Sequence, residues 1–182
     1  EMGPLVRIEP YNYLYIKVRP EDCEEIYNTT VVGGKPVERL LYSMNGVTYP
    51  AQEDIPFYAK QMRLVLKNCG HIGAEHIEEA LAFDGYKALE KALFEMTPEE
   101  VINVIYDSNL RGRGGGGFQT GYKWKQVARQ EEKIRYIVCN GDEGDPGAFM
   151  DRSVMEGDPH KMIEGMLIAA YAVGAAEGYI YV

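Results

Sequence analysis

The residues best suited to chemistry in this chain of 182 residues form a glycine block with aromatic and basic side chains beside it. Six of the ten residues from Gly112 to Gly121 are glycine, which is more than an ordinary turn requires. Consecutive glycines let the backbone approach a ligand closely, adopt positive φ angles and direct several N–H groups at one anion. Phe118 and Trp124 add flat rings, and Lys123 adds a positive charge. This combination predicts a site for a phosphate-bearing aromatic cofactor, either a nucleotide or a flavin.

Other interpretations of the glycine block are a flexible loop and two known motifs. A flexible surface loop stays open, although such a loop has no need of flanking rings. A P-loop is excluded, because Tyr122 follows Gly121 where that motif requires lysine. Residues 112–117 formally spell G-x-G-x-x-G, but no predicted strand precedes them, so a Rossmann fingerprint fails. A single RGG-type segment in a chain of net charge −9 disfavours RNA binding.

A second group of polar side chains follows a predicted strand. Asn140 is followed by Asp142, Glu143 and Asp145 on a glycine-containing turn. Carboxylates accept hydrogen bonds from ribose hydroxyls and ring N–H groups, and an amide side chain both donates and accepts. A solvated turn is the alternative, and a calcium loop fails because the alternating acidic register with a distal glutamate is missing. We therefore interpret residues 140–151 as a second part of the ligand site.

The histidines and cysteines are interpreted as structural. His71 and His76 are five residues apart, a spacing unsuited to one helical face, and His160 is expected to cap or pack against the start of a helix. The three cysteines are expected to be small core residues; they are Cys23, Cys69 and Cys139.

The chain is predicted to be an α/β protein in two parts. Residues 1–42 combine β-rich stretches with a short helix that Pro20 opens, which indicates a small α+β unit. Residues 43–52 have turn chemistry and little periodicity, so they are the predicted linker. Residues 53–182 make the second part.

The second part is predicted to begin with helices. Apolar residues recur at spacings of three and four between Ile55 and Cys69, which predicts one helix. Two shorter helices are predicted at His76–Phe83 and Tyr86–Phe94. The sequence Thr-Pro-Glu-Glu at 97–100 is a capping box that starts a fourth helix.

The second part is predicted to end in a βαβ unit, which is the beginning of a Rossmann-like arrangement. Ile134–Cys139 reads as a buried strand, Pro159–Gly174 as an apolar helix and Gly178–Val182 as the next, parallel strand. Ligands of open α/β sheets bind beyond the carboxyl ends of the strands. The acidic turn after Cys139 is therefore predicted to lie where a ligand belongs.

The composition excludes several classes of protein. There are 19 Lys and Arg against 28 Asp and Glu, which argues against a nucleic-acid-binding or anionic-membrane surface. No run of about 18 uncharged apolar residues predicts a membrane-spanning helix. Three scattered cysteines without a C-x-x-C pair fit a reducing, cytoplasmic setting. Because the chain ends inside the apolar run Gly178–Val182, we interpret it as a piece of a longer polypeptide.

Three motifs stand in order and make a specific combination. They are G-R-G-G-x-G-F-x-T-G-x-K-W at 112–124, V-C-N-x-D-E-x-x-P-G-x-F-x-D-R at 138–152 and D-P-H-K-x-I-E-G-M-L-I-A-A-Y at 158–171. Together they resemble the NADH-binding flavoprotein subunit of respiratory complex I and its relatives in soluble NAD(P)-linked hydrogenases and formate dehydrogenases. Residues 1–42 resemble the tail of the thioredoxin-like [2Fe–2S] domain of the hydrogenase-type members. Residues 53–182 resemble the N-terminal part of the FMN- and NADH-binding domain.

The resemblance implies FMN as the hydride acceptor, NAD(H) or NADP(H) as the donor, and iron–sulfur clusters that take electrons singly. The implied cofactor contacts are Gly112, Gly114, Gly115, Lys123, Asn140, Asp142 and Glu143. Phe118 matches a ring that packs on the NADH adenine, Asp145 matches a carboxylate that hydrogen-bonds NADH, and Glu143 is the candidate catalytic residue. No residue here is a predicted metal ligand, since the [4Fe–4S] and [2Fe–2S] cysteines of the whole protein would lie outside this stretch.

The sequence also departs from the family pattern. The family usually has Ala, Pro and Glu where Gly116, Gln119 and Asp145 stand. The first two departures are expected to loosen the loop, and the third shortens the reach of the carboxylate. The expected partners are NAD(P)H and the iron–sulfur subunits of a complex I-like or hydrogenase complex. The alternative is a catalytically silent folding or docking fragment without a bound cofactor.

Overall fold

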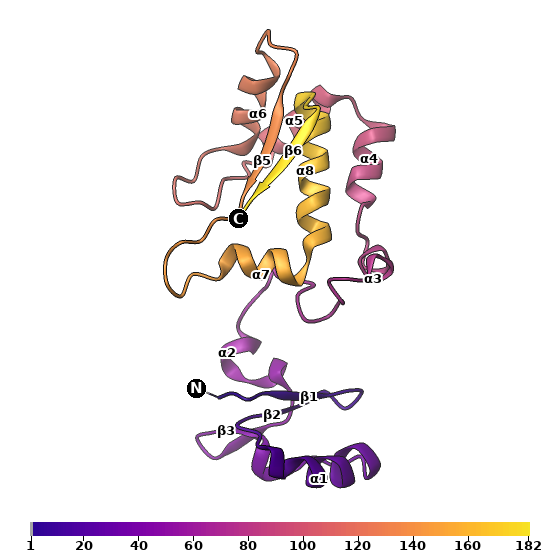
Figure 1. The fold of residues 1–182 in the computed structure, drawn as a ribbon, viewed down its shortest axis with the longest axis vertical. Helices are drawn as coiled ribbons and strands as arrows, with labels where there is room; N and C mark the ends of the chain where they lie inside the picture. The colour runs from indigo at the N-terminus through magenta and orange to yellow at the C-terminus, as the bar shows by residue number, and fades with distance from the viewer. Residues whose placement is uncertain (1) are drawn as a thin grey trace. The chain divides into compact units, whose positions relative to one another are not determined.

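The computed structural model describes residues 2–182, and the chain divides into two compact units, Glu1–Arg63 and Leu64–Val182 (Figure 1). The division lies after Arg63, whereas the sequence predicts a linker at residues 43–52. Within residues 2–182, no helix has the length and apolar character that crossing a bilayer requires. Helices and small sheets are mixed, so the α/β class is confirmed at this coarse level.

The first unit is built from short elements. They are β1 (Val6–Ile8), β2 (Tyr13–Tyr15), η1 (Pro20–Asp22), α1 (Cys23–Ile26), η2 (Tyr27–Val32), η3 (Glu38–Leu40), β3 (Tyr42–Met44), β4 (Val47–Tyr49), η4 (Gln52–Asp54) and α2 (Pro56–Ala59). Strands β1 and β2 pair antiparallel, which confirms the two predicted β-rich stretches. The helix that Pro20 was predicted to open is also confirmed, and helical backbone continues to Val32.

The predicted linker is a hairpin of the first unit. Strands β3 and β4 pair antiparallel around Asn45 and Gly46, whose φ angles are 54° and 77°. Asn-Gly favours the two-residue turn with two positive φ angles, whose twist matches that of paired strands. Pro50 O then accepts the Leu14 N–H (2.8 Å), which ties this segment to strand β2. The turn chemistry that suggested a linker therefore closes a hairpin instead.

Tyr15 organises the core of the first unit. Its side chain is fully buried among Val18, Ile26 and other apolar residues. Its hydroxyl lies 2.5 Å from Thr30 Oγ1 and accepts the Val37 N–H at 3.0 Å. These two hydrogen bonds offset the cost of burying the hydroxyl. Through them Tyr15 of β2 is joined to Thr30 of η2 and to the backbone of the following loop at Val37.

The single helix predicted between Ile55 and Cys69 is wrong. Helix α2 ends at Ala59, and the side chain of Met62 is 82% exposed. An apolar stripe stabilises a helix only when it packs on a partner. Because the Met62 side chain is mostly exposed, it gains little from packing. Spacing alone therefore overstated the helical content of this segment.

The second unit contains the remaining helices and a two-stranded sheet. They are α3 (Ile77–Ala82), α4 (Lys87–Glu95), α5 (Pro98–Asp107), α6 (Thr120–Ala128), β5 (Tyr136–Asn140), α7 (Met150–Gly157), α8 (Pro159–Val173) and β6 (Glu177–Tyr181). The predicted capping box is confirmed, because Thr97 Oγ1 accepts the Glu100 N–H (3.3 Å) and Glu100 Oε2 accepts the Thr97 N–H (2.7 Å). Helix α8 begins where Asp158 Oδ1 accepts the Lys161 N–H and ends at Gly174, whose φ is 68°.

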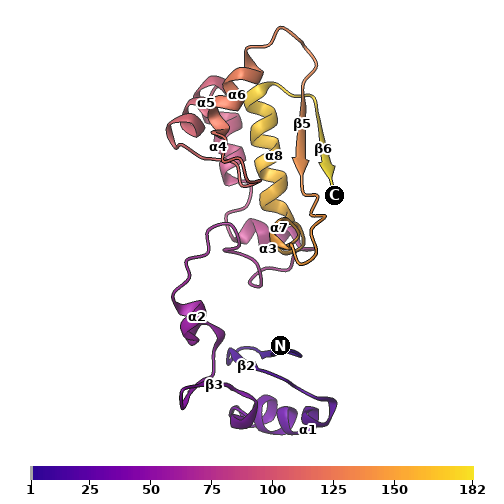
Figure 2. The same cartoon turned by 90° about the vertical axis from the view of Figure 1, so that its left-hand side faces the viewer.

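The predicted parallel β-α-β connection is confirmed. Strands β5 and β6 pair in parallel, with Val138 opposite Tyr179. Helix α8 lies along one face of this sheet, α6 lies beside α8 and borders a hollow shared with β5, and α4 and α5 pack on α8 (Figures 1 and 2). The strand at 134–139 was predicted to be buried, and this is wrong for the sheet face that points away from α8. On that face Val138 is 63% exposed and Tyr179 is 53% exposed. The outer face is exposed because none of the helices of this unit lies on it.

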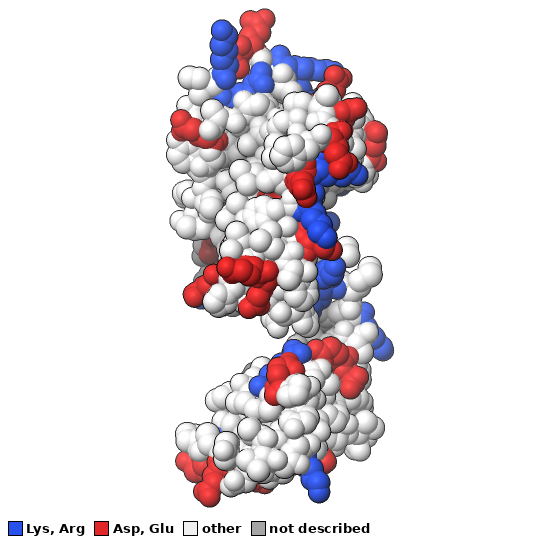
Figure 3. Space-filling model, turned by 90° about the vertical axis from the view of Figure 1, so that its right-hand side faces the viewer, with Lys and Arg blue, Asp and Glu red and all other residues white. Residues whose placement is uncertain are grey.

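Charged side chains of both signs are interspersed on the face drawn in Figure 3. Lys and Arg do not gather there into one continuous basic field. Together with the net charge of −9, this pattern gives no support to nucleic-acid binding.

Candidate functional site

The glycine block is the tip of a loop with a short antiparallel neck. Phe118 O accepts the Gly112 N–H at 2.8 Å, and Leu110 O accepts the Thr120 N–H at 2.9 Å. These two hydrogen bonds hold the segment that follows helix α5 against the segment that precedes helix α6. The neck therefore positions the tip, residues 113–117, while the backbone N–H groups of the tip take no part in its hydrogen bonds.

The tip presents an open backbone. A Cβ atom added at any position from Gly114 to Gly117 would have no neighbour within 4 Å. Gly115 and Gly117 have φ angles of 105° and 58°, which side chains rarely adopt. Within residues 2–182, the N–H groups of residues 113–117 donate to no acceptor. Free N–H groups on a flexible backbone fit a phosphate, so the tip suits the group that the sequence predicts.

Gly121 has a different role from the glycines of the tip. Its Cβ would lie 2.4 Å from both Tyr106 Cα and Tyr106 N. Glycine at this position therefore allows helices α5 and α6 to cross closely. Sequence analysis counted Gly121 with the cofactor loop, but the structure assigns it to helix packing.

The aromatic and basic residues beside the loop separate into two groups. Phe118 is 54% exposed, and its ring lies 6.0 Å from that of Tyr122. Trp124 is half-buried and packs against the core of the second unit. Lys123 and Trp124 both line a hollow of about 520 Å³ between α6, α8 and β5, which also includes Cys139. Phe118 is thus exposed at the loop, whereas Lys123 and Trp124 border the hollow beside the strands.

The acidic turn lies at the carboxyl end of the parallel strands, as predicted. Tyr181 O at the end of β6 accepts the Gly141 N–H (2.8 Å), which anchors the turn to both strands. Asn140 Oδ1 accepts the Asp142 N–H at 3.1 Å. Asp142 and Asp145 line a hollow of about 550 Å³ at this end.

Glu143 is held by a helix that sequence analysis missed. Its two carboxylate oxygens accept the N–H groups of Asp151 and Arg152, each at 3.0 Å, in the first turn of α7. The backbone N–H groups of Arg152 and Asp151 lower the pKa of Glu143 below its ordinary value. The candidate catalytic residue is therefore an ionised carboxylate whose position is fixed by α7.

Lys123 and the acidic turn line two different hollows. The hollow of the acidic turn includes Glu143 but no residue of the glycine loop. The hollow that Lys123 lines includes strand β5 but none of the three acidic side chains. The chain thus presents two separate parts of a site, one with free N–H groups and a lysine and the other with carboxylates.

The structure adds residues that sequence analysis did not select. Arg111 Nη1 donates to Gly117 O (3.0 Å) and braces the loop. Arg152 and Met155 on α7 line the acidic hollow. The two residues on α7 were missed because the predicted turn ended at Asp151 and no helix was predicted between it and Asp158. The sequence signals for this helix are Met150 and Val154, and the oppositely charged Arg152 and Glu156, each pair spaced four residues apart.

The remaining candidates are structural, with one correction. His160 Nδ1 lies 2.9 Å from the Tyr86 hydroxyl, which confirms the packed role expected of it. Cys23 is exposed, so its expected place in the core is wrong, and Cys69 and Cys139 are half-buried. Within the part of the chain that the structure describes, no group of three or more His, Cys, Asp or Glu side chains is placed to hold a metal ion.

Comparison with known proteins places this geometry in context. Residues 105–182, which include the glycine loop and the acidic turn, match the family described as the Nuo51 FMN-binding domain. The chain is 50% identical over 123 residues to the NADP-reducing hydrogenase subunit HndC of Solidesulfovibrio fructosivorans, covering 68% of this chain and 25% of that protein. It is 49% identical over 136 residues to a subunit of the NADH-quinone oxidoreductase of Aquifex aeolicus, covering 74% of this chain and 31% of that protein.

A solved structure also shares the fold. It is a crystal structure of a NAD+-reducing [NiFe]-hydrogenase in the H2-reduced state, with a TM-score of 0.51 and 22% identity. The match covers 100% of this chain and 28% of that one. The chain thus spans about a quarter to a third of the length of the relatives it matches. The resemblance carried by the three motifs is confirmed: this chain is similar to a part of the flavoprotein subunits of NADH-quinone oxidoreductases and NADP-reducing hydrogenases.

Proposed function

We propose that this chain is part of a flavoprotein oxidoreductase subunit that takes a hydride from NADH or NADPH onto FMN and passes electrons to iron–sulfur clusters. One observation carries the proposal. The open backbone of residues 113–117, with its unpaired N–H groups among the described residues, lies inside the stretch that matches an FMN-binding family. When bound, FMN supplies the hydride acceptor and the single-electron donor, and the protein supplies binding and orientation.

The glycine loop is the proposed phosphate-binding part. The N–H groups of Gly114 and Gly115 face no acceptor in residues 2–182, so a phosphate gains their hydrogen bonds without breaking any. Gly112 supports the tip from the neck, and Lys123 adds one positive charge next to the strands. The exposed ring of Phe118 is the proposed stacking surface for the adenine of the dinucleotide.

The acidic turn is the proposed orienting part. Asn140 and Asp142 lie at the end of β5, where their side chains reach hydroxyl and ring N–H groups of a cofactor. Asp145 is exposed and free to accept a hydrogen bond from the dinucleotide. Glu143 stays ionised because α7 holds it, so in the proposed site it acts as a fixed negative charge and hydrogen-bond acceptor beside the reacting groups.

The wider assignment follows the same comparison. The β-α-β unit of the second unit is the proposed beginning of a Rossmann-like domain, and residues 1–42 are the proposed tail of a thioredoxin-like domain. The proposed partners are iron–sulfur subunits in a cytoplasmic complex. The hydrogenase relative and the quinone oxidoreductase relative are both named as subunits, which supports a role within an assembly.

The test is flavin retention in the complete protein that contains this chain. We expect stoichiometric FMN, with flavin absorbance that bleaches when NADH or NADPH is added. Gly114→Val is expected to abolish flavin retention, because the side chain fills the space that the phosphate requires, while thermal unfolding stays nearly unchanged because no protein atom lies within 4 Å. A valine variant that retains full FMN would exclude this loop as the cofactor site.

A further inference from the structure

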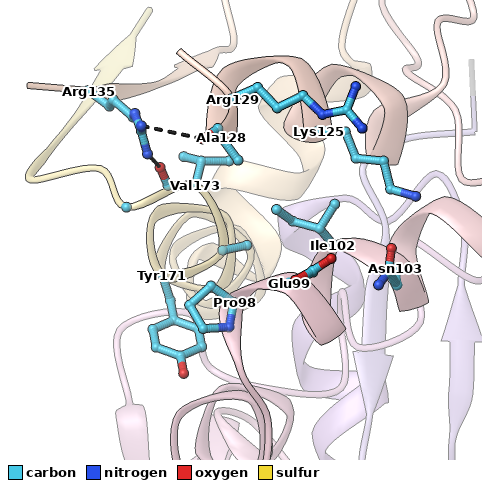
Figure 4. Close-up of a pocket in the computed structure, with 12 residues that line it drawn as sticks. Pro98, Glu99, Ile102, Asn103, Lys125, Ala128, Arg129, Arg135, Tyr171 and Val173 are labelled. Carbon is cyan, nitrogen blue, oxygen red and sulfur yellow. Dashed lines mark hydrogen bonds between the residues drawn. The ribbon is translucent and has the colours of Figure 1, made fainter. Parts of the chain in front are cut away.

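A groove of about 540 Å³ lies at the end of the second unit opposite to the acidic turn. It is bounded by the first turn of α5, the last turn of α6 and the last turn of α8 (Figure 4). Arg135 and Gly174, which precede β5 and β6, also line it, whereas the acidic turn follows β5. The groove is therefore separate from the proposed flavin site.

The walls of the groove carry unequal charge. Lys125, Arg129 and Arg135 face one carboxylate, Glu99. Figure 4 shows Lys125 and Arg129 extending from α6 on one wall, with Glu99 on α5 across from them. In residues 2–182 neither Lys125 nor Arg129 forms an ion pair. An unpaired basic wall in a chain of net charge −9 favours an acidic ligand.

Arg135 is already committed to the fold. Its guanidinium donates to Val173 O at 2.6 Å, to Gln130 O at 2.8 Å and to Ala128 O at 3.4 Å. These carbonyl groups lie at or just beyond the ends of α8 and α6, where the helix dipoles are negative. Arg135 therefore balances two helix ends through Nη1 and Nη2, while its buried Nε has no hydrogen-bond partner among the described residues.

The floor of the groove is apolar. Ile102, Ala172 and Val173 are 5%, 2% and 2% exposed, and the ring of Tyr171 closes one side. Lys125 Nζ lies 3.7 Å from the centre of the Tyr106 ring, which holds its charge at the α6 wall. A ligand that fits this arrangement has an acidic group for the wall and an apolar group for the floor.

We infer that this groove docks a segment of a partner protein subunit that carries an acidic side chain next to an apolar one. The acidic side chain pairs with Arg129 and Lys125, and the apolar one covers Ile102 and Ala172. A small dianion fits less well, because the free cationic groups lie on one wall only, the C-terminal ends of α6 and α8 disfavour a buried negative charge, and Glu99 already stands at the positive end of α5. The inference rests on the proposed function in one respect, namely that the chain works as a subunit of an assembly.

The first experiment is photo-crosslinking in the purified complete complex. The crosslinking amino acid p-benzoylphenylalanine replaces Arg129, and in a matched control it replaces Gln126, an exposed residue of α6 outside the groove. We expect Arg129 to crosslink to another subunit, at a segment where mass spectrometry finds Asp or Glu beside an apolar residue, and Gln126 not to reach that segment. A crosslink to a second copy of this chain, or none to another subunit, would overturn the inference.

The second experiment reverses the charge of the wall. The double variant Lys125→Glu with Arg129→Glu is expected to weaken retention of the partner subunit about tenfold or more at 0.15 M salt. The matched Gln126→Glu variant is expected to retain it. FMN content and NADH oxidation with an artificial acceptor are expected to stay unchanged in both variants. Normal subunit retention in the double variant would reject the docking groove and leave the flavin proposal intact, whereas a flavin-free unmodified complex would reject only the flavin proposal.

Discussion

The glycine loop and the acidic turn are organised in opposite ways. The tip of the loop has open space around Gly114 to Gly117, its N–H groups at 113–117 have no acceptor among the described residues, and only the Arg111 side chain braces it, at Gly117 O. The acidic turn is fixed by the chain itself, because Glu143 binds the start of α7 and Gly141 binds the end of β6. We therefore expect the loop to be organised by its proposed ligand, whereas the turn is already organised by the chain itself.

The largest expected effect separates packing glycines from ligand glycines. Gly121→Val places a Cβ 2.4 Å from the backbone of Tyr106, so α5 and α6 must move apart. We expect a loss of about 3 kcal/mol or more in the free energy of unfolding, measured by chemical denaturation. Gly114→Val is the control and is expected to change the free energy of unfolding by less than about 1 kcal/mol. Equal losses in the two variants would contradict the distinction.

The next prediction isolates ligand binding from backbone strain. Gly115→Val and Gly46→Val both place a side chain at a positive φ angle, 105° and 77°, with no neighbour within 4 Å. Each is expected to cost about 1–3 kcal/mol of stability in the complete protein. Only Gly115→Val is expected to weaken FMN binding, by about a hundredfold, which corresponds to about 2.8 kcal/mol. FMN content is measured by flavin absorbance. A comparable loss of FMN in both variants would show that backbone strain, and not the loss of a ligand contact in the loop, causes the loss.

The 182-residue chain alone is expected to bind FMN weakly. Lys123 of α6 and the acidic turn line different hollows, and no glycine of the loop lines either of the two, so a flavin ring touches one wall at a time. Leaving about 100 Å² of apolar ring surface hydrated costs roughly 2.5 kcal/mol, which is close to a hundredfold in affinity. Titration followed by flavin fluorescence measures this, with the complete protein as control. A submicromolar dissociation constant would show that these residues already enclose the cofactor.

Local chemistry predicted the elements whose signals are local. The capping box at Thr97, the β-α-β connection and the loop before α6 follow from capping groups, apolar periodicity and glycine content. The helix predicted from Ile55 to Cys69 failed because periodicity does not reveal whether a packing partner exists. Gly121 could not be separated from its neighbours, since close contact between α5 and α6 is a tertiary property.

The acidic turn shows the same limit at a functional residue. Its position after β5 was predictable, because strand ends gather polar ligand-binding groups. The partner of Glu143 was not predictable, since Asp151 and Arg152 lie eight and nine residues later, beyond the spacing of a local capping box. Sequence therefore located the carboxylate but not the helix that holds it.

The smallest expected effect tests whether α7 organises the turn. Glu143→Gln removes the charge that the Asp151 and Arg152 N–H groups stabilise, and it leaves a carbonyl acceptor in place. We expect faster hydrogen exchange at those two amides with little change elsewhere. The matched control is Asp142→Asn, which removes the same charge from a side chain that does not bind α7.

The pH dependence of that protection gives the sharper result. The folded protein lowers the pKa of Glu143 below its ordinary value of 4.5, because the α7 N–H groups favour the ionised carboxylate. Its stabilisation is therefore complete above pH 4.5 and is lost as the pH falls through the lowered pKa of the folded state. Amide exchange in the first turn of α7 is expected to lose this acid dependence in Glu143→Gln and to keep it in Asp142→Asn. If both variants keep it, another group stabilises the first turn of α7, and Glu143 is not what organises the acidic turn.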